Sequence, residues 1–168
     1  MEATQKNICQ LEYETTNRRI NTEFSRRSLE THALYYQRQK TLDDKRRQEK
    51  EAIANLRNSL KKQLEEAQMQ CNEMHRSGLE FFSPQMEENT RVQKRIEAQL
   101  QECRFNESDS ALEYKHRSGE LRLQFQEQCH NNSAWRDEQI AQNKEDLQRK
   151  MLEIMAQPPF AETEQTTD

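Results

Sequence analysis

Residues that form turns are scarce in this sequence. Only 2 glycines and 3 prolines occur among its 168 residues, and a compact fold that reverses direction several times needs more of both. Hydrophobic residues make up 32% of the chain and charged residues 33%, which is too little apolar material to enclose a conventional globular core. These shortages argue against most enzyme folds and favour long helices, which need neither frequent turns nor a closed core.

Signals for export and for membrane insertion are also missing. The first six residues, Met-Glu-Ala-Thr-Gln-Lys, lack the basic and then apolar layout of a signal peptide. The longest apolar run, residues 33–36, is far shorter than a membrane span. We therefore expect a cytoplasmic protein, with association with the cytoskeleton or a nuclear location as further options, and no membrane insertion. The four widely spaced cysteines are then expected to be reduced thiols: Cys9, Cys71, Cys103 and Cys129.

Straight-chain residues with high helix propensity dominate what is present. Gln, Glu, Lys, Arg, Ala and Leu are abundant along most of the chain, and these residues lose little side-chain freedom in a helix. Disorder is the competing interpretation, but the net charge of -4 is small and apolar residues recur at helical spacing. The composition predicts an all-α protein of elongated coiled-coil helices.

The first predicted element is a long helix over residues 1–75, which contain no glycine or proline. Its apolar stripe is interrupted, because residues 43–51 contain no apolar side chain. Before this gap the stripe consists of Ile20, Phe24, Thr31, Leu34 and Tyr35. After the gap a heptad has position a at Ile53, Leu60, Ala67 and Met74 and position d at Leu56, Gln63 and Gln70. Polar residues at d cost stability and restrict partner choice, so we expect heteromeric more than homomeric pairing.

Further elements follow from helix end signals. Gly78 suits the left-handed conformation that ends a helix, and Ser83 with Pro84 suits the start of the next one. Polar residues 106–110 and a capping box from Ser110 to Glu113 predict a second break. Residues 120–126 fit a strand or a helix, and context favours the helix. The predicted segments are a loop at 76–83, helices at 84–105, 111–130 and 131–156, and a disordered tail at 157–168.

The segments before and after the first loop are of nearly equal length. This predicts an antiparallel helical hairpin that turns near residues 76–83, with an extended rod as the alternative. Folding there pairs positions whose numbers sum to about 159, because each step along one helix is matched by a step back along the other. The charged gap at 43–51 is then expected to lie opposite residues 108–116.

The predicted functional residues are those that pack helix against helix. Knobs-into-holes burial needs apolar side chains at three- and four-residue steps. The candidate partner seam is Ile53, Leu56, Leu60, Leu64, Met74, Val92, Ile96, Leu100, Ile140, Leu147, Met151 and Ile154. Other coiled-coil proteins are the partners that this seam implies.

Neither a catalytic nor a cofactor site is predicted. No Gly-rich phosphate loop, nucleophile elbow or metalloprotease motif occurs. Cys71 and His75 lie four residues apart, and Cys129 with His130 could complete four zinc ligands, but this spacing matches no zinc finger. We expect no metal, since Cys71 also suits a small apolar role beside the seam.

Basic residues are concentrated in residues 15–47, which hold 9 Lys or Arg and 4 Asp or Glu. This segment is a candidate contact for an acidic polymer surface. The alternative is a solvated helix face with internal pairs such as Asp43 with Arg47. The candidate contacts are Arg18, Arg19, Arg26, Arg27, Arg38, Lys40, Lys45, Arg46 and Arg47.

The sequence therefore predicts a non-enzymatic coiled-coil structural or adaptor subunit of a multiprotein assembly. A cytoskeletal or chromosome-segregation assembly is the first hypothesis, because long helical spacers are common there. A vesicle-tethering or organelle-biogenesis complex is the alternative. A third hypothesis is a nucleic-acid-binding protein that uses residues 15–47.

Overall fold

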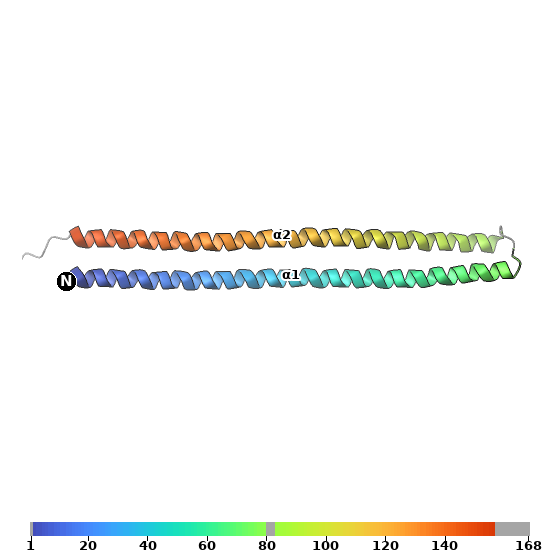
Figure 1. The fold of residues 1–168 in the computed structure, drawn as a ribbon, viewed down its shortest axis with the longest axis horizontal. Helices are drawn as coiled ribbons and strands as arrows, with labels where there is room; N and C mark the ends of the chain where they lie inside the picture. The colour runs from blue at the N-terminus through green and yellow to red at the C-terminus, as the bar shows by residue number, and fades with distance from the viewer. Residues whose placement is uncertain (1, 80–82, 157–168) are drawn as a thin grey trace, which may run out of the picture. The chain divides into compact units, whose positions relative to one another are not determined.

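The chain folds into two long helices, which we describe from a computed structural model that covers residues 2–79 and 83–156. Helix α1 spans Glu2–Arg76 and helix α2 spans Pro84–Ala156. The two helices pack antiparallel as a hairpin (Figure 1). The prediction of an all-α hairpin is confirmed, whereas the tail predicted at 157–168 lies outside the described residues.

Both helix ends at the turn have the predicted chemistry. Gly78 adopts a φ of 81°, which a residue without Cβ reaches at little cost. The amide of Leu79 donates to the Met74 carbonyl (3.1 Å) and that of Gly78 to the His75 carbonyl (3.2 Å). These two bonds form a Schellman motif that satisfies the last carbonyls of α1. Helix α2 begins at Pro84, and the Ser83 hydroxyl accepts from the Met86 amide (3.4 Å) as its N-cap.

The breaks predicted at residues 106–110 and between 130 and 131 are wrong. Helix α2 is continuous through both regions, and residues 120–126 are helical. Ser110 does not cap a new helix. Its hydroxyl instead contacts α1, where it accepts from Arg46 (2.5 Å) and donates to Glu49 (2.6 Å). Polar side chains that resembled a helix end therefore find partners on the neighbouring helix, which removes the need for a break.

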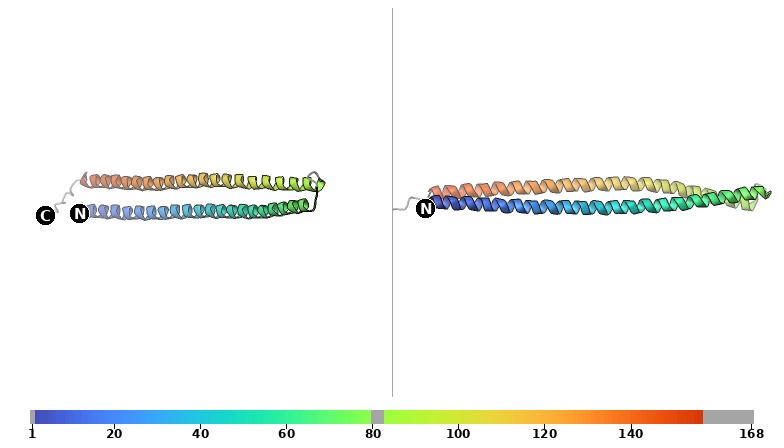
Figure 2. Two further views of the ribbon diagram at one scale, coloured as in Figure 1. Left: turned by 45° about the vertical axis from the view of Figure 1, so that its right-hand side comes forward. Right: turned by 60° about the horizontal axis from the view of Figure 1, so that its bottom comes forward.

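The helix pair divides into two compact units, which we describe separately. The loop unit is Tyr35–Leu123, and the terminal unit combines Met1–Leu34 with Gln124–Asp168. Within each unit the α1 and α2 segments lie side by side in every view (Figure 2). Each unit therefore has its own seam between the helices.

The apolar core of the loop unit is small. Leu60, Ile96 and Cys103 are buried and pack together. Half-buried apolar side chains surround them: Ile53, Leu64, Val92 and Leu100. Ala67 and Met86 of this unit are also buried. Complete burial of one large apolar side chain contributes about 1.5–3 kcal/mol, so these few residues supply most of the apolar burial in this unit.

Cross-helix bonds confirm the predicted pairing of positions. In the loop unit Tyr114 donates to Asp43 (2.7 Å), and Ser110 donates to Glu49 as described above. In the terminal unit Asn143 donates to Asn17 (2.9 Å). These residue numbers sum to values near 159, and the charged gap at 43–51 does lie opposite residues 108–116. The extended rod is therefore not the fold.

Candidate interaction surfaces

The predicted seam in the loop unit is formed, but by contacts within the chain. Leu60 and Ile96 are buried, and the neighbouring seam residues are half-buried. Leu56 is the exception, since 53% of it is exposed. Arg57 occupies the adjacent inward position, where its guanidinium donates to Glu107 (3.1 Å). The whole column that was assigned to position d is exposed: Leu56, Gln63 and Gln70. That assignment is wrong, because the inward positions follow steps of four and three residues through Arg57, Leu64 and Cys71 instead.

In the terminal unit the predicted stripe also faces the neighbouring helix. Ile20 is buried, Phe24 and Thr31 are half-buried, and Leu34 is 48% exposed. The α2 residues that were assigned to the seam are all half-buried: Ile140, Leu147, Met151 and Ile154. The inward faces of both helices in this unit thus pack against each other within the chain.

Two reciprocal cation–π contacts connect the helices of the terminal unit. The Arg27 guanidinium carbon on α1 lies 3.9 Å from the Trp135 ring centroid on α2. The Arg136 guanidinium carbon on α2 lies 4.7 Å from the Phe24 ring centroid on α1. Arginine over an aromatic face is attracted by the negative face of the ring. The sequence patterns did not predict these contacts, although the single Trp of the chain indicated that a large side chain is packed there.

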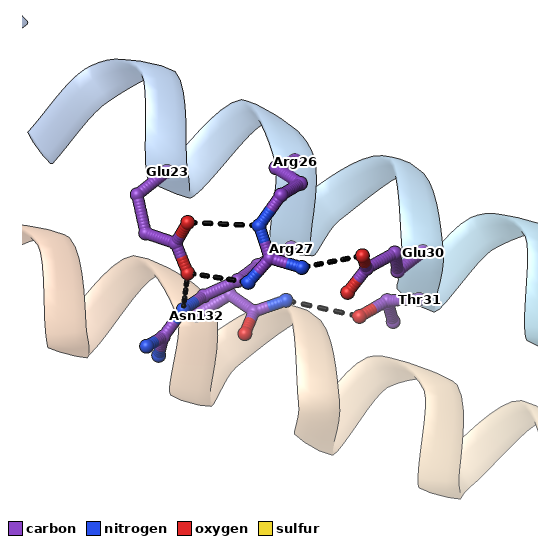
Figure 3. Close-up of polar contacts among 6 residues, drawn as sticks. All are labelled: Glu23, Arg26, Arg27, Glu30, Thr31 and Asn132. Atoms are coloured by element: carbon purple, nitrogen blue, oxygen red, sulfur yellow. Dashed lines mark hydrogen bonds and ion pairs between the residues drawn. The ribbon is translucent and has the colours of Figure 1, made fainter. Parts of the chain in front are cut away.

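An ion-pair cluster lies beside these contacts (Figure 3). The Glu23 carboxylate accepts from Arg26 (2.6 and 2.8 Å) and from Arg27 (2.9 Å). These hydrogen bonds, from Arg26 first and then from Arg27, lower the pKa of Glu23 from 4.5 to about 2. Across the seam the Asn132 amide donates to the Thr31 hydroxyl (3.0 Å). Arg26 and Arg27 are therefore engaged inside the chain.

The middle of the loop unit is a polar zone instead of an apolar seam. The Ser110 hydroxyl lowers the pKa of Glu49 by hydrogen bonding to its charged form. The bond from Tyr114 to Asp43 raises the pKa of the tyrosine, because loss of its proton would place two negative oxygens together. Gln39 also reaches this zone, where its side-chain oxygen accepts from Ser118 (3.3 Å). These directional bonds define one register of the two helices.

Several basic side chains of residues 15–47 form ion pairs or hydrogen bonds within the chain. Besides Arg26, Arg27 and Arg46, Lys45 lies 3.6 Å from Glu49 and Arg47 lies 2.9 Å from Asp44. The pair predicted between Asp43 and Arg47 is wrong, because Asp43 accepts from Tyr114 instead. The side chains of four of the candidate contacts form no ion pair or hydrogen bond among residues 2–79 and 83–156: Arg18, Arg19, Arg38 and Lys40. The first two belong to the terminal unit and the last two to the loop unit.

Large apolar side chains are exposed on outward positions of each unit. In the loop unit Phe105, Leu112 and Leu123 are 60%, 63% and 66% exposed. In the terminal unit Leu11 and Leu29 are 63% and 72% exposed. The residues of each unit lie one behind another along a helix, about 10 Å or more apart, and exposed apolar side chains that align in this way are candidates for a protein interaction site. These residues were not predicted, because partner binding was assigned to the inward seam, although their spacing of seven, eleven and eighteen residues is visible in the sequence.

The remaining chemistry is limited in the part of the chain that the structure describes. There, no group of three or more His, Cys, Asp or Glu side chains is placed to hold a metal ion. The four cysteines are free thiols, with Cys103 buried and the other three half-buried. No described helix combines the length and hydrophobicity needed to cross a bilayer.

Comparison with known proteins gives no relative: no protein-family model, curated protein or solved structure matches the chain. Function therefore has to be inferred from the surfaces themselves. What those surfaces offer is association with another protein through exposed apolar side chains.

Proposed function

We propose that this chain is a non-enzymatic coiled-coil adaptor that binds helical proteins and organises a multiprotein assembly. The observation that carries the proposal is the exposure of large apolar side chains on outward positions, while the inward faces are already paired. Exposed apolar surface is costly in water, and burial against a partner recovers about 25 cal/mol for each Å² removed. A partner surface gives these residues a role that the hairpin alone does not.

The terminal unit supplies the first surface for a heteromeric partner. Leu11 and Leu29 are eighteen residues apart, which is five helical turns, so they fall on one line along α1. Small or weakly polar residues continue this line between and beyond them: Thr15, Thr22 and Ala33. Arg18 also lies on this line and is exposed, so the surface that another helix would meet combines two leucines with one basic side chain.

The assembly that we favour is cytoskeletal or involved in chromosome segregation. Long helices with few turns commonly serve as spacers and connectors in such assemblies. This support comes from the class of protein and from no particular motif. A vesicle-tethering or organelle-biogenesis complex would use the same surfaces. Nucleic-acid binding has less support, because five of the nine basic candidates already contact groups within the chain.

The test compares partners recovered by the tagged full chain and by the double variant Leu11→Glu, Leu29→Glu. We expect a specific helical protein to be recovered with the first and lost with the second, because two carboxylates cannot be buried in an apolar contact. The matched control, Gln5→Glu with Asn21→Glu, adds the same charge at exposed polar positions away from this line and should retain the partner. Equal recovery with all three proteins would contradict the proposal.

The class of assembly needs separate measurements on the purified chain. Co-sedimentation with microtubules or actin filaments tests the cytoskeletal hypothesis, and flotation with lipid vesicles tests the tethering hypothesis. A salt titration of DNA or RNA binding tests the third, because neutralised phosphates give a steep dependence on salt. Binding in only the last assay would replace the adaptor with a nucleic-acid-binding protein.

A further inference from the structure

A line of apolar side chains runs along the outward face of α2 in the loop unit. Phe105, Leu112 and Leu123 are separated by seven and eleven residues, which are close to two and three helical turns. All three are at least 60% exposed. On the opposite side of the same helix Ser110 and Tyr114 contact α1. The line therefore points away from the seam, and no described residue covers it.

Gly119 lies on this line, seven residues after Leu112 and four before Leu123. It is inside a continuous helix, and its φ is not positive. A Cβ placed there would meet nothing within 4 Å, so neither backbone conformation nor packing within the chain requires glycine. Glycine costs about 1 kcal/mol relative to alanine in a helix interior. The close approach of another helix is a contact that would use the missing side chain.

Charge is sorted on the two sides of the line. Since consecutive helical residues are about 100° apart, one flank is mainly acidic and the other is basic. Arg117 also lies on the acidic side, where it pairs with Glu113, and His116 lies on the line itself, 3.6 Å from Glu120. The acidic flank consists of Glu102, Asp109, Glu113 and Glu120, and the basic flank of Arg104, Lys115 and Arg122. The three basic side chains are exposed and form no ion pair or hydrogen bond within the described ranges 2–79 and 83–156. Their charges are thus available to a partner.

The sorting of charge decides which orientation of a second copy fits this face. Two identical helices in antiparallel orientation bring like flanks together, acidic against acidic and basic against basic. In parallel orientation the acidic flank of one helix lies along the basic flank of the other. With Phe105, Leu112 and Gly119 at position d of a heptad, Lys115 is at g and meets Glu120 at e of the second copy, which is the five-residue offset of flanking pairs in parallel coiled coils.

We propose that the loop unit binds a second copy of this chain through this face, with the two α2 helices parallel and in register. The twofold axis places Leu112 against its counterpart and lets the backbones approach at Gly119. Each flanking ion pair then occurs twice. This inference rests on the proposed function, because it names one partner of the adaptor, but it uses residues that are distinct from Leu11 and Leu29.

The first test is the mass of the purified full chain by light scattering and sedimentation equilibrium, with charge-swap variants. We expect two chain masses for the native sequence. Lys115→Glu alone and Glu120→Lys alone should each weaken the dimer by about tenfold, because two attractive pairs become repulsive. The double variant Lys115→Glu, Glu120→Lys should restore the native affinity. A monomer at all concentrations, or a double variant as weak as the singles, would overturn the proposal.

Orientation is tested by disulfide formation in a chain whose native cysteines are replaced by alanine, once circular dichroism and mass have shown that it still forms the dimer. Phe105→Cys alone and Leu123→Cys alone should each form a symmetric cross-link under mild oxidation. Gln99→Cys, an exposed control off the face, should form little. Cross-linking only in a mixture of Phe105→Cys with Leu123→Cys would indicate an antiparallel dimer and refute the parallel one.

Gly119→Ala distinguishes a contact from a local helix effect. Alanine should raise the melting temperature of the helices, since it fits without a clash and has higher helix propensity. The same change should weaken the dimer several-fold, because methyl groups separate the two backbones. A variant with higher melting temperature and unchanged dimer affinity would remove Gly119 from the interface. Loss of the dimer would leave the partner recovered through Leu11 and Leu29 unaffected, so the two proposals fail independently.

Discussion

The guanidinium of Arg27 lies over the ring of Trp135, with 3.9 Å between its central carbon and the ring centroid. Arg136, the residue after Trp135, stacks in the reverse direction on Phe24 of α1. Each helix of the terminal unit therefore contributes one arginine and one aromatic ring to this contact. Because the chain has a single Trp, its fluorescence reports on this contact alone.

Arg27→Met should destabilise the terminal unit by about 1 kcal/mol. Methionine keeps much of the aliphatic length but removes the charge that the indole face attracts. The measurement is urea unfolding followed by Trp135 fluorescence and by circular dichroism. Arg26→Met is the control, because Arg26 pairs with Glu23 and Glu30 but is recorded in no aromatic contact. Equal effects of the two substitutions would show that the ring contact contributes nothing.

Leu60→Ala should cost about 2–3 kcal/mol of unfolding free energy. Leu60 is 4% exposed and packs with Ile96 and Cys103, so truncation leaves a cavity in the loop unit. Leu56→Ala, at a position that is 53% exposed, should cost less than about 0.5 kcal/mol. The measurement is urea unfolding at one protein concentration. A larger loss for Leu56→Ala would mean that a partner or a second copy covers Leu56.

Tyr114 should lose its proton at higher pH than an ordinary tyrosine. Its hydroxyl donates to Asp43, which raises its pKa above 10.0 in the folded chain. A group with a raised folded pKa stabilises the fold below its unfolded pKa, and this contribution is lost as pH rises through the folded value. Ultraviolet titration of the 4 tyrosines should show one late component that disappears in Tyr114→Phe. Identical curves, apart from one fewer tyrosine of ordinary pKa, would contradict the bond.

Glu23 makes the stability of the fold depend on pH in the opposite sense, and at acid pH. Its pKa of about 2 in the folded chain lies below the ordinary value of 4.5. The stabilisation from its bonds to Arg26 and Arg27 is therefore present above pH 4.5 and is lost as pH falls towards 2. Carbon-detected NMR of the Glu23 carboxyl should show this low midpoint. Glu23→Gln should lower stability at pH 7 and have little effect near pH 2.

The hairpin could be predicted because the residues that form its turn act locally and because the two helical segments have nearly equal lengths. Gly78, Ser83 and Pro84 mark the turn by their own conformational preferences, and the equal lengths of the two arms set the pairing. The continuity of α2 could not be predicted in the same way. Residues 106–110 look like a helix end by themselves, and only the neighbouring helix supplies the groups that Glu107 and Ser110 bind.

The position of the exposed surfaces could be predicted only in part. The predicted seam included the buried residues Leu60 and Ile96, but it also included the exposed Leu56. Arg57 is charged and was not expected to face inward, although Leu64 and Cys71 follow it at seven-residue steps and it pairs with Glu107. Likewise, Phe105, Leu112 and Leu123 have helical spacing in the sequence. That they are outward depends on which face α1 covers, and this is a property of the packed pair.

The antiparallel arrangement of α1 and α2 in the terminal unit has a mechanical consequence. A pull applied between Glu2 and Ala156 would not shear the two helices past each other. It would peel them apart from one end, so that the ion pair between Glu12 and Lys150 (2.7 Å) breaks before the bond from Asn143 to Asn17 is loaded. Because the contacts are stressed in turn and not together, we expect opening at low force, with resistance rising only when the contacts of Arg27 with Trp135 and of Arg136 with Phe24 are reached.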